Sequence, residues 1–307
     1  MRIVVHGQQA FGRAVLERLL ERQEDVVGVF CAPDREGRPD DPLKELALEK
    51  GLPLHQPASW KTPEAEALMR SFEADLCVMA YVTLFVPQPV LDAPALGTIQ
   101  YHPSLLPKHR GPSSINWPII QGETKTGLTI FWPDEGLDEG PILLQKEVDI
   151  GPDDTLGTLY FNHLFPMGVD AMIEAMDLVR DGRAPRIAQD DSQATYESWC
   201  RKADAQIDWR KPARDVYNLI RGTSPQPGAW TTLGGNELKI FDSALADAAD
   251  AAGEPGQVVE VTEDGFTVAA GGGAIRISRV RPHDDKKISA GDYAARVGLS
   301  EGTRLGS

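Results

Sequence analysis

The chain has 307 residues, more than a single domain of roughly 100 to 200 residues needs, so we expect two domains. Its formal net charge of −15 repels phosphate backbones and disfavours a large nucleic acid partner. No run approaches the ~20 consecutive apolar residues that span a bilayer, and the first residues lack the pattern of a signal peptide. We therefore expect a soluble, cytoplasmic protein with no membrane partner.

Strand and helix signals alternate along the first part of the chain. A short apolar strand, a Gly-containing turn and a helix with apolar residues at helical spacing open the sequence. A later apolar run is typical of a buried parallel strand. The predicted strands lie at residues 3–5, 26–30 and 75–81, and later helices at 43–49 and 63–72. This alternation predicts an α/β fold with a doubly wound, mostly parallel, Rossmann-like sheet.

Two more strands and a long helix complete the first predicted domain. The strands lie at residues 97–101 and 126–132, with a helix that begins near Ser113 between them. A long helix from about residue 155 to 181 follows, and a Gly and a Pro after it mark its end. We assign residues 1–187 to this domain.

A smaller domain is predicted for the rest of the chain. Residues 188–205 are polar and are interpreted as a linker, and residues 206–307 form the second domain. A helix at 212–220 precedes short strands separated by turn residues, which predicts a small OB-like β-barrel. These strands lie at 230–232, 237–241, 256–261, 265–270 and 274–280, and the Ala- and Asp-rich stretch 244–256 is interpreted as a surface loop.

The most informative stretch, residues 99–112, centres on His102. A strand that ends at His102 puts Gln100 and His102 on the same face, because side chains alternate with a period of two. Open α/β sheets bind ligands beyond the carboxyl ends of their strands. Pro103 and Pro107 stiffen the loop that follows. An amide and an imidazole are therefore expected to point together into a ligand site.

A second stretch, residues 131–142, follows a strand and is acidic. Gly136 and Gly140 bracket its turn, so Asp138 could approach a ligand through a loop with permissive backbone. A histidine and an aspartate on adjacent strand ends could form a general base unit. From the residues alone, His102 would more often be a structural histidine at the end of a strand.

These motifs resemble the signature of the formyltransferase family that uses 10-formyltetrahydrofolate. The signature reads His102-Pro103-Ser104-Leu105-Leu106-Pro107-x-x-Arg110-Gly111, followed by Gly136-Leu137-Asp138-x-Gly140. The similarity covers nearly the whole chain and extends to residues 151–155 and 207–209. Several other stretches, among them residues 143–147 and 227–230, are most similar to the hydrolase domain of 10-formyltetrahydrofolate dehydrogenase.

The resemblance implies a formyl donor and a set of site residues. The donor would be 10-formyltetrahydrofolate, with His102 polarising the formyl oxygen and Asp138 holding the imidazole charged and ordering or deprotonating the nucleophile. The family has an asparagine where this chain has Gln100, whose amide can donate the same hydrogen bond to an oxyanion. The residues implied to hold the pterin ring are Phe85, Val86, Pro133, Asp134, Glu135, Gly136 and Leu137.

Other candidate motifs are weaker. Residues 7–13 match no phosphate-binding loop. The basic cluster of Lys108, His109 and Arg110 could meet the glutamate tail of the folate or a phosphate, or could form a solvated loop. The histidines show no metal-ligand spacing, and the three cysteines no paired spacing. We expect no metal, no disulfide and mostly buried, reduced thiols.

Three hypotheses about the reaction stay open. In the first, the formyl group passes to water or a small amine, as the resemblance to the hydrolase domain implies. In the second, the chain acts as a methionyl-tRNA formyltransferase, which the OB-like barrel and residues 286–292 favour and the acidic loop 33–42 disfavours. In the third, Gln100 marks an impaired site that binds folate without turnover. No oligomeric state is predicted.

Overall fold

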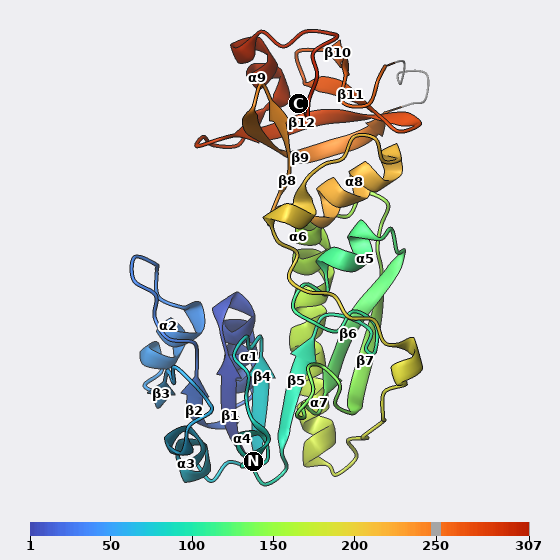
Figure 1. Ribbon diagram of the computed structural model, residues 1–307. Coiled ribbons are helices and arrows are strands. Elements are labelled where there is room, and N and C mark those ends of the chain that lie inside the picture. The colour runs from blue at the N-terminus through green and yellow to red at the C-terminus, as the bar shows by residue number, and fades with distance from the viewer. Residues whose placement is uncertain (247–252, 307) are drawn as a thin grey trace. The chain divides into compact units, whose positions relative to one another are not determined.

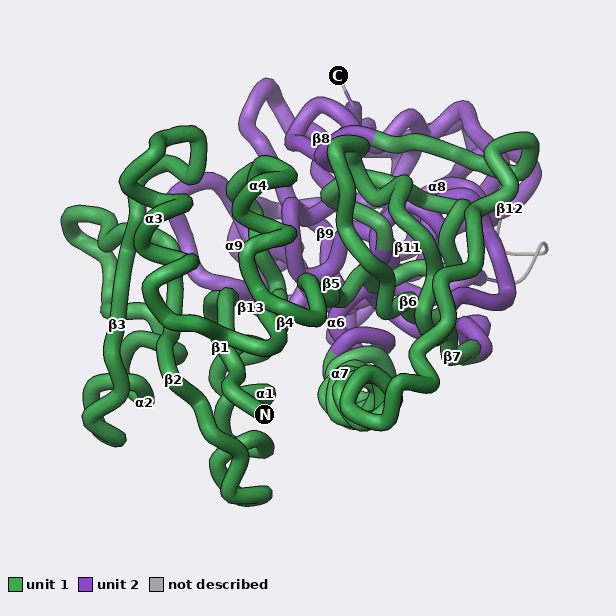
Figure 2. Tube along the Cα trace, turned by 90° about the horizontal axis from the view of Figure 1, so that it is seen from below, with its two compact units in different colours: residues 1–114, 127–148, 161–197 green, residues 115–126, 149–160, 198–307 purple. Residues whose placement is uncertain are grey.

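The computed structural model describes residues 1–246 and 253–306 (Figure 1). They divide into two compact units (Figure 2). Unit 1 contains Met1–Ser114, Gly127–Val148 and Phe161–Glu197, and unit 2 contains Ile115–Thr126, Asp149–Tyr160 and Ser198–Ser307. Each unit thus combines segments far apart in sequence. The domain boundaries at residues 187 and 206 stay predictions.

A seven-stranded sheet forms the framework of unit 1, in the order β3-β2-β1-β4-β5-β6-β7. All pairs from β3 to β5 are parallel, whereas β5 and β6 are antiparallel. The mostly parallel α/β sheet is therefore confirmed. Its strands are β1 (Arg2–Gly7), β2 (Asp25–Phe30), β3 (Leu54–His55), β4 (Leu76–Ala80), β5 (Thr98–His102), β6 (Lys125–Phe131) and β7 (Ile142–Asp149).

Both faces of this sheet are buried, because successive side chains on its central strands enter different hydrophobic clusters. On β1, Ile3 and Val5 belong to one cluster and Val4 to the other. Helices α1 (Gln9–Glu21), α2 (Pro42–Glu49) and α7 (Phe165–Arg180) contribute to the first cluster, and α3 (Pro63–Ser71) and α4 (Gln88–Leu91) to the second. Helices on both faces make the sheet doubly wound.

The long helix expected at residues 155–181 is three consecutive segments. They are α6 (Leu156–Leu159), a π-helical turn (Tyr160–Leu164) and α7. Pro166 has no N–H to donate to the carbonyl four residues earlier, which explains why the regular α-helical ladder is interrupted there. Asp181 caps α7 and Gly182 follows with a φ of +66°, as the sequence predicted. The helix expected near Ser113 is the short α5 (Asn116–Ile120).

Unit 2 contains an antiparallel sheet in the order β10-β11-β12-β9-β8, with β13 paired to β12. This order is an open path without a pair between β10 and β8 in the described residues, so the predicted closed OB-like barrel is not confirmed. Its strands are β8 (Ala229–Leu233), β9 (Asn236–Ala246), β10 (Val258–Val261), β11 (Phe266–Ala270), β12 (Gly273–Pro282) and β13 (Ile288–Ser289). Of the loop expected at residues 244–256, Ala244 to Ala246 belong to β9, and residues 247–252 lie outside the described residues.

Helix α8 (Ala213–Gly222) is the helix expected at 212–220, and α9 (Ala290–Val297) was not expected. Two 3₁₀ turns, Asp191–Gln193 and Lys202–Ala205, interrupt the predicted linker. None of the helices in the described part of the chain has the length and apolar character to cross a lipid bilayer.

Candidate active site

The last residue of β5, His102, points to the opposite sheet face from Tyr101. The Tyr101 ring stacks on Phe11 in the first hydrophobic cluster, with centroids 4.3 Å apart. Because side chains alternate, Gln100 and His102 share the other face, as predicted. His102 is 5% exposed. A buried imidazole needs a hydrogen-bond partner, and the loop that follows β5 supplies one.

His102 is held by backbone on one side and faces a carboxylate on the other. Its Nε2 lies 2.9 Å from the carbonyl oxygen of His109, which can only accept, so Nε2 carries the proton in this bond. Its Nδ1 lies 3.6 Å from Oδ2 of Asp138. That separation exceeds a hydrogen bond, and the contact is an ion pair only when the imidazole is protonated. The structure thus brings together the two residues predicted as a catalytic pair.

Asp138 belongs to the loop between β6 and β7 and is itself 6% exposed. Its Oδ2 accepts a hydrogen bond from the Gly111 N–H at 2.8 Å. Its φ is +60°, a conformation that aspartate adopts more readily than most residues. Because β6 is antiparallel to β5, with Phe131 opposite Gln100, this loop does not start at the carboxyl end of β5 as expected. The loop nevertheless places Asp138 beside His102.

Two glycines are required where these loops pass close to other backbone. A Cβ on Gly140 would lie 1.8 Å from the Trp132 carbonyl oxygen, and one on Gly111 would lie 2.3 Å from that of Glu197. Gly111 also has a φ of +107°. Both glycines belong to the motifs singled out in the sequence, and the structure gives the steric reason.

Gln100 is half-buried, and its side-chain amide has no hydrogen-bond partner among the described residues. Its backbone pairs with Met79 on β4 and Phe131 on β6, so it sits in the middle of the sheet. The amide is therefore available to a ligand on the face that also carries His102.

The residues expected to hold a pterin ring differ in exposure. Phe85 is 53% exposed, with the Lys61 ammonium 5.2 Å from its ring centre, whereas Val86 is 7% exposed and packs in the second hydrophobic cluster. In the loop of Asp138, Pro133, Asp134 and Gly136 are half-buried and Glu135 and Leu137 are exposed. Asp134 accepts the Gly136 N–H at 3.0 Å, which tightens the loop.

The basic cluster after His102 is mostly structural. His109 and Arg110 are 3% and 6% exposed, and only Lys108 faces solvent. The His109 ring lies 3.1 Å from a Glu197 carboxylate oxygen, and Arg110 donates to Asp191 at 2.7 Å. The solvated loop and the anion site considered for this cluster therefore do not describe His109 and Arg110.

The sequence did not single out Thr195 and Glu197, two residues of the segment 189–197 that support the site. The backbone of Arg110 bonds with Thr195 and Glu197, and the Thr195 hydroxyl accepts the His109 N–H at 2.8 Å. This segment was predicted to be part of a linker. Its polar composition is compatible with either role, so no sequence signal marked it.

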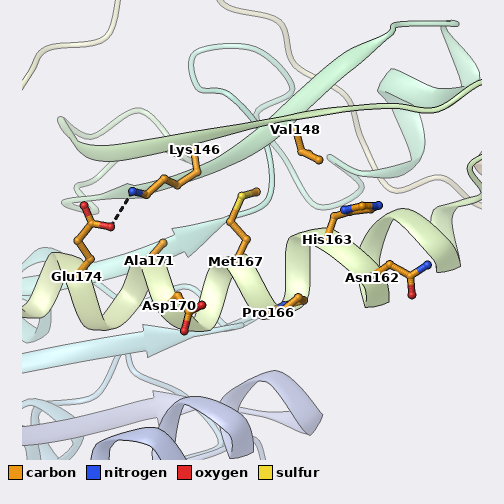
Figure 3. A pocket seen from close by; sticks show the side chains of 9 residues that line it. All are labelled: Lys146, Val148, Asn162, His163, Pro166, Met167, Asp170, Ala171 and Glu174. Carbon is orange, nitrogen blue, oxygen red and sulfur yellow. Dashed lines mark ion pairs between the residues drawn. The ribbon is translucent and has the colours of Figure 1, made fainter.

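A separate depression lies between β7 and α7 (Figure 3). Lys146 reaches across it to Glu174, with an ion pair of 2.7 Å, and apolar groups such as Val148 and Met167 also line it. None of the predicted site residues lines it. In the described part of the chain, no group of three or more His, Cys, Asp or Glu side chains is arranged to hold a metal ion.

Burial shifts the pKa values of the three cysteines and of His6. It raises the pKa values of Cys31, Cys77 and Cys200 to about 12, with nearby carboxylates adding to the effect at Cys31 and Cys200. All three are free thiols. Burial also lowers the pKa of His6 to about 3, and Nδ1 of His6 has no hydrogen-bond partner among the described residues.

Comparison with known proteins matches both parts of the chain to family models. The formyl transferase model matches residues 1–176, and the model of the formyl transferase C-terminal domain matches residues 200–298. The cytosolic 10-formyltetrahydrofolate dehydrogenase of Xenopus tropicalis is 40% identical over 306 residues, 95% of this chain and 34% of that protein. The methionyl-tRNA formyltransferase of Trichlorobacter lovleyi is 39% identical over 309 residues, 99% of this chain and 96% of that protein.

Solved structures agree in fold. HypX from Aquifex aeolicus, in complex with tetrahydrofolic acid, superposes with a TM-score of 0.70 at 19% identity and covers 98% of this chain and 48% of its own. An N-formyltransferase from Helicobacter canadensis has a TM-score of 0.69 at 19% identity, covering 90% and 98%.

The fold and site define a doubly wound α/β protein with a buried imidazole and carboxylate paired at the sheet. The chain belongs to the formyl transferase family. It spans about a third of the length of the dehydrogenase relatives that it matches.

Proposed function

We propose that this protein removes the formyl group of 10-formyltetrahydrofolate and passes it to water or to a small amine. The observation that carries the proposal is the pair of His102 and Asp138, buried together with Nδ1 and Oδ2 3.6 Å apart. The folate-dependent relatives support the choice of donor. The pterin ring would contact Phe85, Val86 and the loop Pro133–Leu137.

Two atoms of the pair, Oδ1 of Asp138 and Nδ1 of His102, would act in the formyl transfer. Oδ1 of Asp138 has no hydrogen-bond partner among the described residues, so it can accept a proton from the attacking water or amine. Nδ1 of a charged His102 can donate to the formyl oxygen as it becomes an oxyanion, and the Gln100 amide can add a second donor. The new bond forms between the nucleophile and the formyl carbon. The bond from that carbon to N10 then breaks, and N10 takes up a proton as tetrahydrofolate leaves.

Water or a small amine is favoured as acceptor by the similarity to the dehydrogenase relatives and by the charge of residues 33–42. That loop carries four acidic residues against Arg35 and Arg38, so its net charge is negative, and its Asp34 and Asp40 also bind Lys44 at 2.6 and 2.8 Å. The cytoplasmic location and the OB-like barrel stay predictions.

The second candidate is methionyl-tRNA formyltransferase activity. The relative from Trichlorobacter lovleyi supports it, because that protein and this chain cover each other almost completely. A third possibility is a folate-binding protein impaired by Gln100. The impairment would require that the longer glutamine displaces the amide from the oxyanion.

The three candidates are separated by tracing a radioactive formyl group. Purified protein is incubated with 10-[¹⁴C]formyltetrahydrofolate alone, with small amines, and with charged initiator tRNA. Label in formate or a formylated small amine is the expected result. Label only in methionyl-tRNA would establish the second candidate, and saturable folate binding without any transfer would establish the third.

A further inference from the structure

We infer that Gln189 is a positioning residue that fixes the loop after His102 and the loop of Asp138 relative to each other. The inference rests on the proposed function. Gln189 is half-buried and lies in the stretch that its sequence alone marked as a linker. It touches neither of the paired side chains. Its role would be to fix the backbone that carries them.

Four hydrogen bonds connect the Gln189 amide to both loops. Oε1 accepts from Nε and Nη2 of Arg110 at 3.2 and 2.9 Å. Nε2 donates to the carbonyl oxygens of Asp138 and Gly140 at 2.9 and 2.8 Å. A guanidinium only donates and a carbonyl only accepts, so this orientation of the amide is dictated by its partners. A side-chain amide, with one carbonyl acceptor and one NH2 donor group, can satisfy both sides at once.

The two loops meet at the catalytic pair. The loop after β5 supplies the His109 carbonyl to His102 and the Gly111 N–H to Asp138. Arg110 lies between His109 and Gly111 in sequence, so the hydrogen bonds from Arg110 to Gln189 hold this loop at the point where it contacts the pair. On the other loop it binds the backbone of Asp138 itself.

The geometry of the pair depends on small displacements. The 3.6 Å gap between Nδ1 of His102 and Oδ2 of Asp138 is not fixed by a direct hydrogen bond. Each of the two side chains is anchored by a backbone group of the loop after β5, so the path of the backbone sets this gap. A misplacement of about 1 Å in a catalytic group can lower a rate about 100-fold. Loss of the Gln189 bonds is therefore expected to lower kcat more than substrate binding.

Two substitutions test the Gln189 amide: one removes all of its hydrogen bonds, and the other removes only those to the Asp138 loop. Gln189→Leu removes all four bonds. Gln189→Glu keeps two acceptors for Arg110 but turns a carboxylate toward the carbonyl oxygens of Asp138 and Gly140. Asp191→Ala is the matched control, since Asp191 also binds Arg110, at 2.7 Å, but its side chain is 82% exposed and has no bond to the Asp138 loop.

The test measures kcat and KM for 10-formyltetrahydrofolate in the full-length variants. We expect kcat to fall 10- to 100-fold in both Gln189→Leu and Gln189→Glu, with KM within threefold of the original. Asp191→Ala should stay within twofold. A Gln189→Glu enzyme with the original kcat, or an Asp191→Ala enzyme with an equal loss, would overturn the inference.

Amide hydrogen exchange gives a readout that needs no activity. In Gln189→Leu the Gly111 amide, which donates to Asp138, should lose at least tenfold in protection. The Gly12 amide, which bonds within α1 to the Gln8 carbonyl, should keep its protection. Unchanged protection of Gly111, or an equal loss at both glycines, would contradict a local positioning role. A wild-type protein without turnover would instead overturn the proposed function and leave this readout intact.

Discussion

Nδ1 of His102 lies 3.6 Å from Oδ2 of Asp138, and each side chain is anchored on its other side by backbone. The carbonyl of His109 orients the imidazole, and the N–H of Gly111 orients the carboxylate. Both side chains are almost fully buried, where charges interact more strongly than in water. The arrangement holds an imidazole and a carboxylate side by side, and Oδ1 of Asp138 has no hydrogen-bond partner among the described residues.

Replacing Asp138 with asparagine tests the charge of this pair. The amide oxygen of Asp138→Asn can still accept the Gly111 N–H, so the loop should keep its shape. The variant loses the negative charge and the proton acceptor, and kcat should fall roughly 10²- to 10⁴-fold. Steady-state kinetics measures this, with folate binding as the control. Full activity in this variant would remove Asp138 from the mechanism.

Gln100 is predicted to donate to the oxyanion. Gln100→Leu should lower kcat by roughly 10²- to 10³-fold, the loss typical of one oxyanion donor. Gln100→Asn restores an amide at this position and should retain more activity than the leucine variant. If the leucine variant matches the original rate, the Gln100 amide takes no part in the reaction.

Gly140 should tolerate no side chain. Because a Cβ would lie 1.8 Å from the Trp132 carbonyl oxygen, Gly140→Ala must displace backbone, at a cost of about 1 to 3 kcal/mol in free energy of unfolding. Gly136→Ala is the comparison in the same loop and should cost less, since the three nearest atoms to its Cβ all belong to the Glu139 side chain, at 2.4 to 2.8 Å, and none to backbone. Thermal unfolding compares the two. Equal stability of both variants would refute the steric argument.

His6 should make the stability of the protein pH-dependent. Burial lowers its pKa to about 3 in the folded protein, against 6.5 for an exposed histidine, so only the unfolded chain takes up a proton between these values. Its contribution is complete above pH 6.5 and is lost as the pH falls toward 3. Between pH 7 and pH 5 the folded protein should lose about 2 kcal/mol that His6→Leu does not lose. Chemical denaturation at both pH values measures this difference, and parallel losses would contradict it.

The sequence predicted the strand that ends at His102, the face that His102 shares with Gln100, and the approach of Asp138 to His102. Alternating apolar segments and spaced motifs carry this local information. It did not predict that β6 is antiparallel to β5, because hydrophobic patterns do not encode strand direction. The resulting path of the Asp138 loop appears only in the structure.

The support from residues 189–197 could not be predicted either. Gln189, Thr195 and Glu197 are polar residues in a segment without periodicity, which is what a linker also looks like. Their role comes from contacts with residues about 50 to 90 positions away. Such contacts depend on the tertiary fold, and a single sequence carries no local signal for them.

The most direct test of the account is the rate at which wild-type protein and His102→Ala release tetrahydrofolate from 10-formyltetrahydrofolate, with tetrahydrofolate binding measured on the same samples. The account predicts turnover by the wild type, a loss of at least about 10³-fold in the variant, and binding within a few fold. A His102→Ala protein that binds folate and turns it over at the original rate would contradict it.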